Sequence, residues 1–364
     1  MPSPLRNQLA PLRARLGWSQ ERTGSYAGIS RQAYAAIEAG RSVPSTEVAL
    51  RLAHAFGEPV DTLFRLADPA AETGIRVPAA LPMHRRGRVR LTRLGGVRHG
   101  WPLHHAPMGT PADGIGEPLP EGQIAVQSFA HRPPEPDLVV VGCDPSFALV
   151  AERLRRDRGL EVLHFEAPSR LALDTLARGA AHLAGIHLPA PDGEGYNAPW
   201  VRTLLPFPAT RFRYAEWEQV LAVEGGNPLG IRSVTDLAQS GIRFINRGLG
   251  SGTRALVEAE LARAGISAET IPGFADTAAH RHGDVAAAIA SGTASAGVAI
   301  RAVVEAHGLT PLPLRTEPYE LVIPDHLLEF PAVEALLQLL RTPGLHREIE
   351  ALGGYDTTGM GRPA

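Results

Sequence analysis

Residues 246–254 read Asn246-Arg247-Gly248-Leu249-Gly250-Ser251-Gly252-Thr253-Arg254, a glycine-rich segment between two apolar patterns. The residues before it, 242–245, form a short apolar run that predicts a buried strand. Residues 255–261 after it have the apolar spacing of a helix. A strand, a glycine-rich turn and a helix start, in this order, predict an anion-binding loop, because the free N–H groups of the first helical turn point into the loop.

The side chains of this loop also suit an anion. Ser251 and Thr253 offer hydroxyl donors, and Arg247 and Arg254 offer fixed positive charge. The alternative interpretation is an ordinary glycine turn in which Ser251 or Thr253 is the N-cap of the helix. The segment lacks both the Gly-Lys-Ser/Thr ending of a Walker loop and the Gly-x-Gly-x-x-Gly fingerprint of dinucleotide-binding domains.

The composition of the 364-residue chain predicts two or three domains and a cytoplasmic location. The net charge is −2, so a nucleic-acid site must be local rather than a property of the whole surface. Cys143 is the single cysteine, which excludes an intramolecular disulfide and any multi-cysteine zinc site. The N-terminus lacks the apolar region of a signal peptide, and no apolar run reaches the roughly 20 residues of a membrane span.

Residues 1–66 predict an all-α domain of short helices. Leucines at helical spacing mark a first helix over residues 5–16, and Ser19 and Ser30 are N-cap candidates for the second and third helices. A helix, a glycine-containing turn and a second helix form a DNA-binding motif. The alternative is a helical bundle that binds protein.

This domain resembles the Cro/phage-repressor-like (XRE) helix-turn-helix family. The resemblance rests on the motifs Leu12-Arg13-x-x-x-Gly17-x-Ser19-Gln20, Gly28-Ile29-Ser30-Arg31-Gln32, Ile37-Glu38-x-Gly40-Arg41-x-x-Pro44 and Leu52-Ala53. It implies that the recognition helix is Ser30–Ala39, with Arg31, Gln32 and Tyr34 facing the major groove and Gln20 and Arg41 near phosphates. Arginine and glutamine make bidentate contacts to guanine and adenine edges.

The sequence departs from that family at Thr23-Gly24, where Leu-Ala is usual. The second helix thereby loses an apolar anchor and carries a glycine that costs about 1 kcal/mol. We expect this change to loosen the domain without removing the DNA-contacting residues.

Residues 67–136 predict a linker and a small β-containing segment. Proline, glycine and alanine are dense over residues 68–82, which indicates a linker. Residues 84–94 and 123–129 contain the alternation of strands. His99, His104 and His105 lack the spacing of metal ligands, so no metal site is expected.

Residues 137–364 predict an α/β domain. Apolar strands alternate with helices, which favours a parallel sheet that binds ligands at the carboxyl ends of its strands. Ser146 and Ser169 lie at two such ends, and each opens a helix. Together with the Ser251 loop they give three helix N-termini with hydroxyl groups.

This second domain resembles cytoplasmic substrate-binding domains related to periplasmic molybdate-binding and tungstate-binding proteins. The resemblance rests on Gly142–Ser146, the run 178–188, Gly226–Gly230, residues 246–254, 285–292 and 296–298, and Glu317–Ile323. It implies a two-lobed, type II periplasmic-binding-protein-like clamshell. Lobe I covers about 137–216 and 318–364 and lobe II about 217–317, with crossings near Tyr214–Val223 and Thr310–Tyr319. The family's usual acidic residue before Ala-Gly is Ser295 here.

The resemblance also implies a ligand site. Its candidates are Ser146, Ser169, Arg247, Ser251, Thr253, Val298 through its backbone N–H, and Tyr319. Molybdate and tungstate are dianions with only acceptor oxygens, so their site needs donors and no carboxylate. We expect Asp144 to cap a turn rather than to face the ligand.

The two domains together predict a one-component transcriptional regulator. A small oxyanion, molybdate or tungstate, would control binding of a homodimer to a double-stranded DNA operator. A small organic ligand is the alternative, because this fold hosts many ligands. No catalytic motif is visible, so we expect no enzyme activity, no cofactor and no membrane partner.

Overall fold

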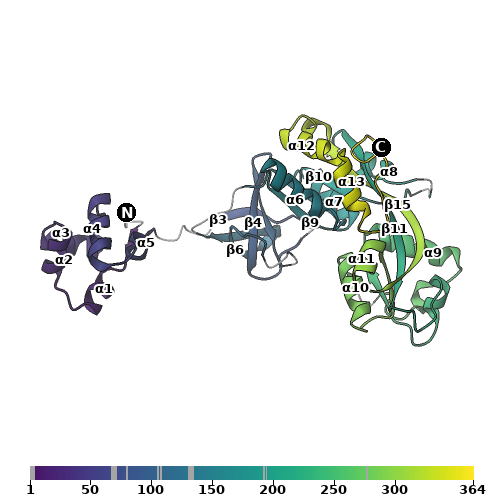
Figure 1. Cartoon of the computed structure of the whole chain (residues 1–364), viewed down its shortest axis with the longest axis horizontal. Coiled ribbons are helices and arrows are strands. Elements are labelled where there is room, and N and C mark those ends of the chain that lie inside the picture. Colours follow the sequence, from purple (N-terminus) through teal and green to yellow (C-terminus); the bar gives the residue numbers. More distant parts are fainter. Residues whose placement is uncertain are drawn as a thin grey trace. The chain divides into compact units, whose positions relative to one another are not determined.

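The protein is described by a computed structural model that covers residues 5–66, 72–78, 81–104, 106, 109–129, 135–191, 193, 195–275 and 278–364. The chain divides into two compact units, Met1–Glu72 and Thr73–Ala364 (Figure 1). The expected combination of a helical N-terminal domain and an α/β domain is confirmed. Within the described part of the chain, no helix combines the length and the apolarity needed to cross a bilayer.

The first unit is a helical domain closed by a small sheet. Strands β1 (Leu5–Asn7) and β2 (Phe64–Leu66) pair antiparallel and bring the two ends of the domain together. Leu5 was expected in the first helix, but it pairs with Leu66 instead. The helices are α1 (Leu9–Arg15), α2 (Gln20–Tyr26), α3 (Arg31–Glu38), α4 (Thr46–Phe56) and α5 (Val60–Leu63).

Serine side chains start three of these helices. The hydroxyls of Ser19, Ser30 and Ser45 accept hydrogen bonds from backbone N–H groups in the first turns of α2, α3 and α4. Gly24 in α2 is buried, and a Cβ there would lie 2.9 Å from the Ile29 carbonyl oxygen. The glycine therefore permits a close approach between α2 and the following turn, and Thr23 beside it is fully buried.

The second unit begins with a closed barrel. Its strands are β3 (Glu72–Arg76), β4 (Gly87–Leu94), β5 (Val97–Pro102), β6 (Gly114–Leu119) and β7 (Gln123–Ser128), in the order β3-β5-β4-β6-β7, with the 3₁₀ turn η1 (Pro120–Gly122) before β7. Residues 72–76 were expected to belong to a linker over 68–82, but they form a barrel strand. Residues 67–71, 79–80 and 131–134 and His105 lie outside the described residues.

The barrel packs on the α/β part of the same unit. Trp101 of β5 stacks on Phe165 with ring centroids 4.3 Å apart, and Leu94 and Leu103 join the same apolar cluster. Arg90 of β4 is buried and lies 3.5 Å from Asp113. The barrel is therefore anchored to the first lobe described next.

The first lobe contains a parallel three-stranded part of the main sheet. Strands β8 (Leu138–Gly142), β9 (Val162–Glu166) and β10 (Leu183–Ile186) alternate with α6 (Phe147–Arg158) and α7 (Ser169–Ala177), and α8 (Ala198–Leu204) follows. The C-terminal η4 (Asp325–Leu327), α12 (Pro331–Leu340), α13 (Pro343–Glu350) and β16 (Tyr355–Asp356) return to this lobe, where α12 packs on α6.

The second lobe has a corresponding parallel part. It contains β12 (Phe244–Arg247), α9 (Gly252–Arg263), β13 (Ala278–Ala279), α10 (His282–Ala290), β14 (Ala296–Ile300) and α11 (Arg301–Ala306). The 3₁₀ turn η2 (Val234–Ala238) precedes β12, and η3 (Ala268–Thr270) lies between α9 and β13. Phe244, Val257 and Val298 belong to its core.

Two long strands connect the lobes. Strands β11 (Ala209–Val223) and β15 (Thr310–Pro324) pair antiparallel from Ala209 opposite Pro324 to Val223 opposite Thr310 (Figure 1). They join the parallel parts of the two lobes into one mixed sheet of order β13-β12-β14-β11-β15-β10-β8-β9. The register shifts between Arg213 and Ala215 and again between Gln219 and Val220. The expected crossings near 214–223 and 310–319 fall within these strands.

Candidate ligand-binding and DNA-binding sites

The glycine-rich loop forms as the sequence predicts. Strand β12 ends at Arg247, and α9 begins at Gly252 after the N-cap Ser251, whose hydroxyl accepts a hydrogen bond from the Arg254 N–H at 3.1 Å. A Cβ at Gly252 would collide with the carbonyl oxygen of His187 in the first lobe. The N–H of Arg170, at the start of α7, also donates to the Gly250 carbonyl at 3.4 Å. The loop of the second lobe therefore lies directly against the first lobe.

Arg247 is a buried cation with unused donors. Arg247 is only 2% exposed, and its Nη2 donates to the His280 carbonyl at 3.0 Å. Its Nε and Nη1 have no hydrogen-bond partner among the described residues. Burial lowers the pKa of this guanidinium, although Cys143, Glu166 and Asp284 oppose the shift. A buried charge with unpaired N–H groups is costly, so this position favours an anionic ligand.

The predicted hydroxyl donors already have partners inside the protein. The Ser146 hydroxyl pairs with the Tyr214 hydroxyl at 2.8 Å, and the Ser169 hydroxyl accepts the His187 N–H at 3.2 Å. Ser251 is the N-cap described above, and Thr253 Oγ1 accepts from Gln219 Nε2 at 3.2 Å. All four serine and threonine residues are buried. In this arrangement they position backbone and neighbouring side chains, and the hydroxyls of Ser169 and Ser251, which accept N–H groups here, keep their own O–H to donate.

The last two candidates, Tyr319 and Val298, are both buried in the second unit. The Tyr319 hydroxyl fits against Gly142 and Gly185, because a Cβ at either glycine would collide with it. It accepts a hydrogen bond from the Asp144 backbone, while burial raises the pKa of the phenol. Val298 lies within β14 opposite Leu221 and belongs to the core of the second lobe.

Asp144 caps a turn, as expected, and also keeps one oxygen free. Its Oδ1 accepts the Ser146 N–H and the Tyr355 hydroxyl, both at 2.8 Å. Its Oδ2 is buried and has no partner in the described structure. Burial raises the pKa of this carboxyl to about 6. A carboxyl group is therefore closer to the site than the anion hypothesis assumed.

Sequence reasoning missed several buried aromatic and imidazole groups. Trp217 contacts His187, His282 and Tyr319, with ring centroids 4.8, 5.5 and 4.7 Å apart. The unpartnered buried atoms, within the described residues, include Trp217 Nε1, His187 Nε2 and both ring nitrogens of His282. We call these groups and their neighbours the interlobe cluster, which consists of Cys143, Asp144, His187, Trp217, Arg247, His282 and Tyr319.

One signal in the sequence could have indicated two members of this cluster. Cys143 follows β8 and His187 follows β10, so both lie at carboxyl ends of parallel strands, where ligands bind in such sheets. The same rule selected the serines, but histidines were considered only at metal-ligand spacing.

His187 and His282 have opposite electrostatic environments. Burial would lower the pKa of His187, but Cys143 and Glu317, whose Oε2 lies 3.0 Å from Nδ1, raise it to about 9. Burial lowers the pKa of His282, and the charges of Arg247 and His187 lower it further. The interlobe cluster therefore combines two positive groups, Arg247 and His187, with a neutral imidazole and the carboxyl group of Asp144.

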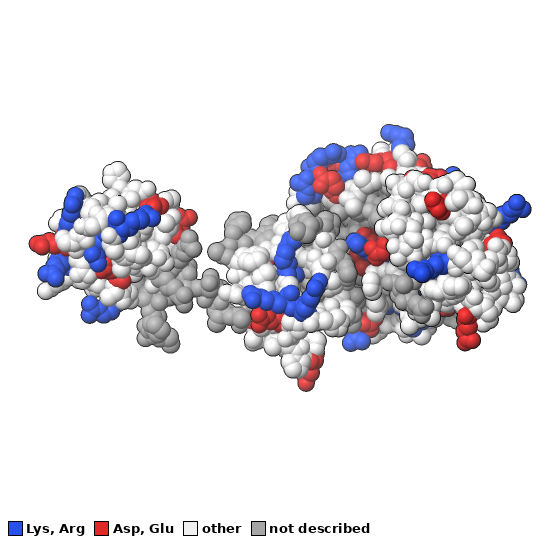
Figure 2. Space-filling model, turned by 90° about the horizontal axis from the view of Figure 1, so that it is seen from below, with Lys and Arg blue, Asp and Glu red and all other residues white. Residues whose placement is uncertain are grey.

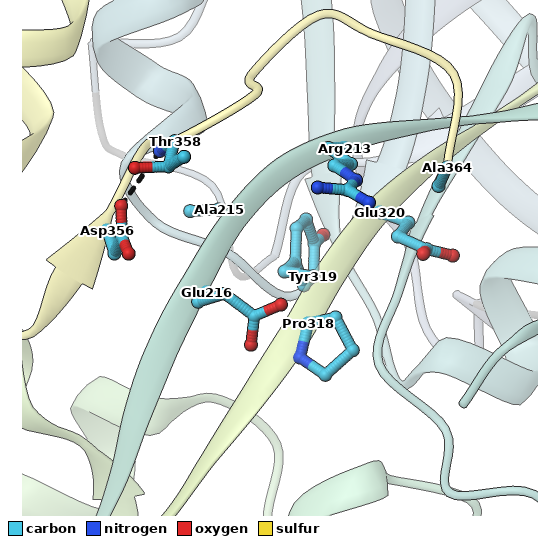
Figure 3. Close-up of a pocket in the computed structure, with 9 residues that line it drawn as sticks. All are labelled: Arg213, Ala215, Glu216, Pro318, Tyr319, Glu320, Asp356, Thr358 and Ala364. Atoms are coloured by element: carbon cyan, nitrogen blue, oxygen red, sulfur yellow. Dashed lines mark hydrogen bonds between the residues drawn. The ribbon is translucent and has the colours of Figure 1, made fainter. Parts of the chain in front are cut away.

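A separate surface pocket of about 290 Å³ lies by the β11 and β15 strands (Figure 3). Glu216, Glu320, Asp356 and the C-terminal Ala364 line it together with Arg213. Asp356 accepts the Thr358 N–H at 2.8 Å, and the Glu320 carboxylate is bound by Arg211 at 2.7 Å. Three carboxylates do not suit a dianion, so we do not assign the oxyanion to this pocket.

The recognition helix of the first unit presents polar side chains. Ser30, Arg31, Gln32 and Arg41 are exposed, so all four are available to a DNA duplex. Tyr34 is not: it is fully buried in the domain core, and its hydroxyl donates to Glu38 at 3.2 Å. The expectation that Tyr34 faces the groove is therefore wrong, because it lies on the core-facing side of α3 with Ile37.

Gln20 belongs to a network around Glu38. Its Nε2 donates to Glu38 Oε2 at 2.6 Å, and Arg13 Nε donates to Oε1 at 2.7 Å. Burial opposes ionisation of Glu38, but Arg13 and Gln20 outweigh it and lower the pKa of the carboxyl. In the view of Figure 2, basic and acidic side chains are interspersed on both units.

Comparison with known families agrees with the division of the chain into a helical N-terminal unit and a second, α/β-containing unit. The model of the PBP superfamily domain matches residues 151–341, which is more than half of the chain, and a helix-turn-helix model matches residues 12–63. The uncharacterised protein YvgK of Bacillus subtilis is 26% identical over 228 residues, covering 62% of this chain and 73% of YvgK. The uncharacterised HTH-type transcriptional regulator YgzD of the same organism is 42% identical over 64 residues, covering 18% of this chain and 97% of YgzD.

A tungstate ABC transporter protein of Geobacter sulfurreducens aligns with a TM-score of 0.47 at 16% identity, over 59% of this chain and 97% of that one. Likeness at this level carries no information on what this chain binds. The family matches give the conclusion: the chain belongs to the PBP superfamily domain family and joins its ligand-binding domain to an N-terminal helix-turn-helix domain of XRE type, the architecture of a transcription regulator.

Proposed function

We propose that this protein is a one-component regulator that senses a small oxyanion such as molybdate or tungstate and binds operator DNA as a homodimer in the cytoplasm. The observation that carries the proposal is Arg247, whose buried Nε and Nη1 have no partner in the described structure. An oxyanion has only acceptor oxygens, and it would satisfy both N–H groups with charge-assisted hydrogen bonds.

Neighbouring donors support the same assignment. Trp217 Nε1 can only donate, and it is also buried without a partner among the described residues. The positive charge that His187 acquires from its raised pKa adds to that of Arg247. The anion would thus be held mainly by Arg247, His187 and Trp217, with the serines and Thr253 in supporting positions.

Calorimetry tests this proposal. Protein treated with a chelator should bind at least one of molybdate, tungstate, sulfate and phosphate. Arg247→Ala should weaken binding at least tenfold, because each charge-assisted hydrogen bond contributes about 1.5–3 kcal/mol. Arg243→Ala is the matched control, since Arg243 is exposed and lies just before β12. Absence of binding by the wild type at millimolar concentration would exclude the oxyanion.

A small organic anion is the second candidate. In the interlobe cluster the Trp217 ring contacts the rings of His187, His282 and Tyr319. Aromatic linings are typical of sites for organic ligands. A thermal-shift screen that pairs small organic acids with inorganic oxyanions separates the two candidates. Stabilisation by organic acids alone would favour the second.

The DNA-binding half of the proposal rests on the exposed residues of α3. We propose that Arg31 and Gln32 contact base edges, while Ser30, Gln20 and Arg41 lie near the phosphate backbone. A dimer of such domains binds a pseudo-palindrome with half-sites about one helical turn apart. Footprinting on the protein's own genome tests this, and the absence of any protected site would contradict it.

A further inference from the structure

Three side chains of metal-ligand type meet within the interlobe cluster. Cys143, His187 and His282 each offer one ligand atom, and these atoms lie within 4.8 Å of one another. Their residues are 2%, 0% and 1% exposed. Thiolate and imidazole are the ligands that zinc and other thiophilic transition metals prefer. The three residues lie far apart in the sequence, so only the fold brings them together.

His187 is oriented as a metal-binding histidine usually is. Its Nδ1 lies 3.0 Å from Glu317 Oε2, and its Nε2 has no partner in the described part of the chain. Metal-bound histidines almost always donate their second ring N–H to a carboxylate or carbonyl, which fixes the tautomer and the ring. Glu317 is itself held by Gln219 Nε2 and by the Tyr196 hydroxyl, both at 3.4 Å.

His282 provides a second, independent indication. It is the first residue of α10 in the second lobe, and neither of its ring nitrogens has a hydrogen-bond partner within the described structure. An imidazole buried in this way is costly unless a ligand pairs with it. Its ring lies edge-on to Trp217, which also contacts His187, so both histidines approach the same place.

We propose that Cys143, His187 and His282 bind a thiophilic transition-metal ion such as zinc, with Glu317 as the orienting carboxylate. Three protein ligands leave the fourth tetrahedral position open. The negative charges of the Cys143 thiolate, Asp144 and Glu317 offset the cation, whereas Arg247 opposes it. With the ion bound, His187 Nε2 would serve the metal instead of the anion, and an anion held by Arg247 and Trp217 would complete both the charge balance and the coordination.

The ion would also connect the two lobes. Cys143 and His187 belong to the first lobe and His282 belongs to the second. Metal binding would release the protons that the thiol and the imidazole carry in its absence. This site goes beyond the sensing of an anion, and it does not depend on which anion the regulator recognises.

Cobalt(II) is a direct probe of the proposed site. Untagged, full-length protein is treated with a chelator under reducing conditions and titrated with Co²⁺. Because Cys143 is the only cysteine, a thiolate-to-cobalt charge-transfer band can arise from no other residue. We expect such a band to saturate at one Co²⁺ per chain and to disappear when one equivalent of Zn²⁺ is added. Its absence in the wild type would overturn the proposal.

Substitutions then assign the ligands. Cys143→Ser should abolish the band, and His282→Ala should weaken Co²⁺ binding at least tenfold. Glu317→Gln should cost about 10–100-fold in affinity, as expected when an orienting partner of a metal ligand is removed. His307→Ala, at an exposed histidine, is the control and should change nothing. Unchanged Zn²⁺ affinity in folded Cys143→Ser protein, judged by circular dichroism, would contradict the assignment.

The same preparation separates this proposal from the anion proposal. If chelator-treated protein binds tungstate but shows no cobalt band, the metal site is wrong and the anion site stands. If the band forms but no oxyanion binds with or without the metal, the metal site stands and the anion is wrong. Enhanced tungstate affinity in the zinc-loaded protein would support the open fourth position.

Discussion

At the scale of single residues, we expect Asp144 to make the proposed anion binding depend on pH. Burial raises the pKa of its carboxyl to about 6, and Oδ2 has no partner among the described residues. A negative carboxylate in the interlobe cluster repels an anion, so protonation as the pH falls from 7.5 to 5.5 removes that repulsion. We predict that affinity rises about three- to tenfold over this range, or about 0.7–1.4 kcal/mol.

Calorimetry with an oxyanion whose own charge is constant over that range checks this prediction. Asp144→Asn should raise affinity at pH 7.5 and flatten the dependence, since asparagine keeps an acceptor for Ser146 and Tyr355. Asp157→Asn, at an exposed position of α6, should leave the profile unchanged. Affinity that falls on acidification would show that another group dominates.

Two residues of the recognition helix region should affect DNA binding in different ways. Gln32→Ala should cost about 1–3 kcal/mol on the operator and relax specificity at one base pair, because the role we propose for Gln32 is contact with a base edge. Arg41→Ala should weaken binding equally on all sequences and flatten its salt dependence, because the role we propose for Arg41 is contact with phosphate. Fluorescence anisotropy over a series of salt concentrations and single-base operator variants measures both effects. Equal loss on all operators for Gln32→Ala would remove it from the base contacts.

The ligand site was only partly predictable at this scale. Arg247 and the loop around Gly252 were found because their signal is local: strand, glycines and helix are consecutive. His187 and His282 were missed because the fold, and not their spacing, makes them neighbours. Tyr34 was misassigned to the DNA surface although its spacing of three residues from Ile37 indicates a shared buried face.

At the scale of elements, Gly24 is required by the contact between α2 and the turn before α3. Replacing an exposed helical glycine by alanine normally stabilises a protein by about 1 kcal/mol. At Gly24 a Cβ would lie 2.9 Å from the Ile29 carbonyl oxygen, and backbone cannot move as easily as a flexible side chain. We predict that Gly24→Ala destabilises the helical domain by about 1–3 kcal/mol.

Scanning calorimetry of the full chain, together with operator affinity, tests this prediction. Ser25→Ala on the exposed side of the same helix is the control, and it should have little effect. A higher unfolding temperature for Gly24→Ala would mean that helix propensity outweighs the close approach.

Elements with a strong local pattern were predictable, and those made by distant pairing were not. Serine caps located α2 and α3, and an apolar run located β12. Strand β1 was missed, because its strand character depends on pairing with β2 at the other end of the domain. Strand β3 was hidden by the glycine and proline content of residues 68–82, yet it pairs with β5 in the barrel.

At the scale of the whole molecule, ligand and operator should affect each other's binding. We expect lobe closure to be a hinge motion within β11 and β15, and it would alter DNA affinity only if the open and closed forms placed the two helical domains of the proposed dimer differently. A typical coupling of about 1–3 kcal/mol would change operator affinity five- to 150-fold at saturating ligand. Operator DNA should change ligand affinity by the same factor.

Residues 67–71 are the place to interrupt this coupling, because replacement of the whole 68–82 segment would delete strand β3. A longer Gly-Ser segment there should leave both separate affinities intact and abolish the coupling, since a flexible connection averages out the spacing. The coupling is measured by titrating operator DNA with and without the effector, and the effector with and without operator DNA. If the coupling survives, the signal passes through the barrel or the dimer interface.

The burial of the interlobe cluster also has a consequence in time. Each of its side chains is at most 2% exposed, and the loop at Gly252 lies against His187 of the opposite lobe. A ligand held there leaves only after the lobes have parted, so its residence time is governed by that opening as well as by its own hydrogen bonds. Such a regulator would respond slowly when its effector is removed, and it would average over brief changes in effector concentration.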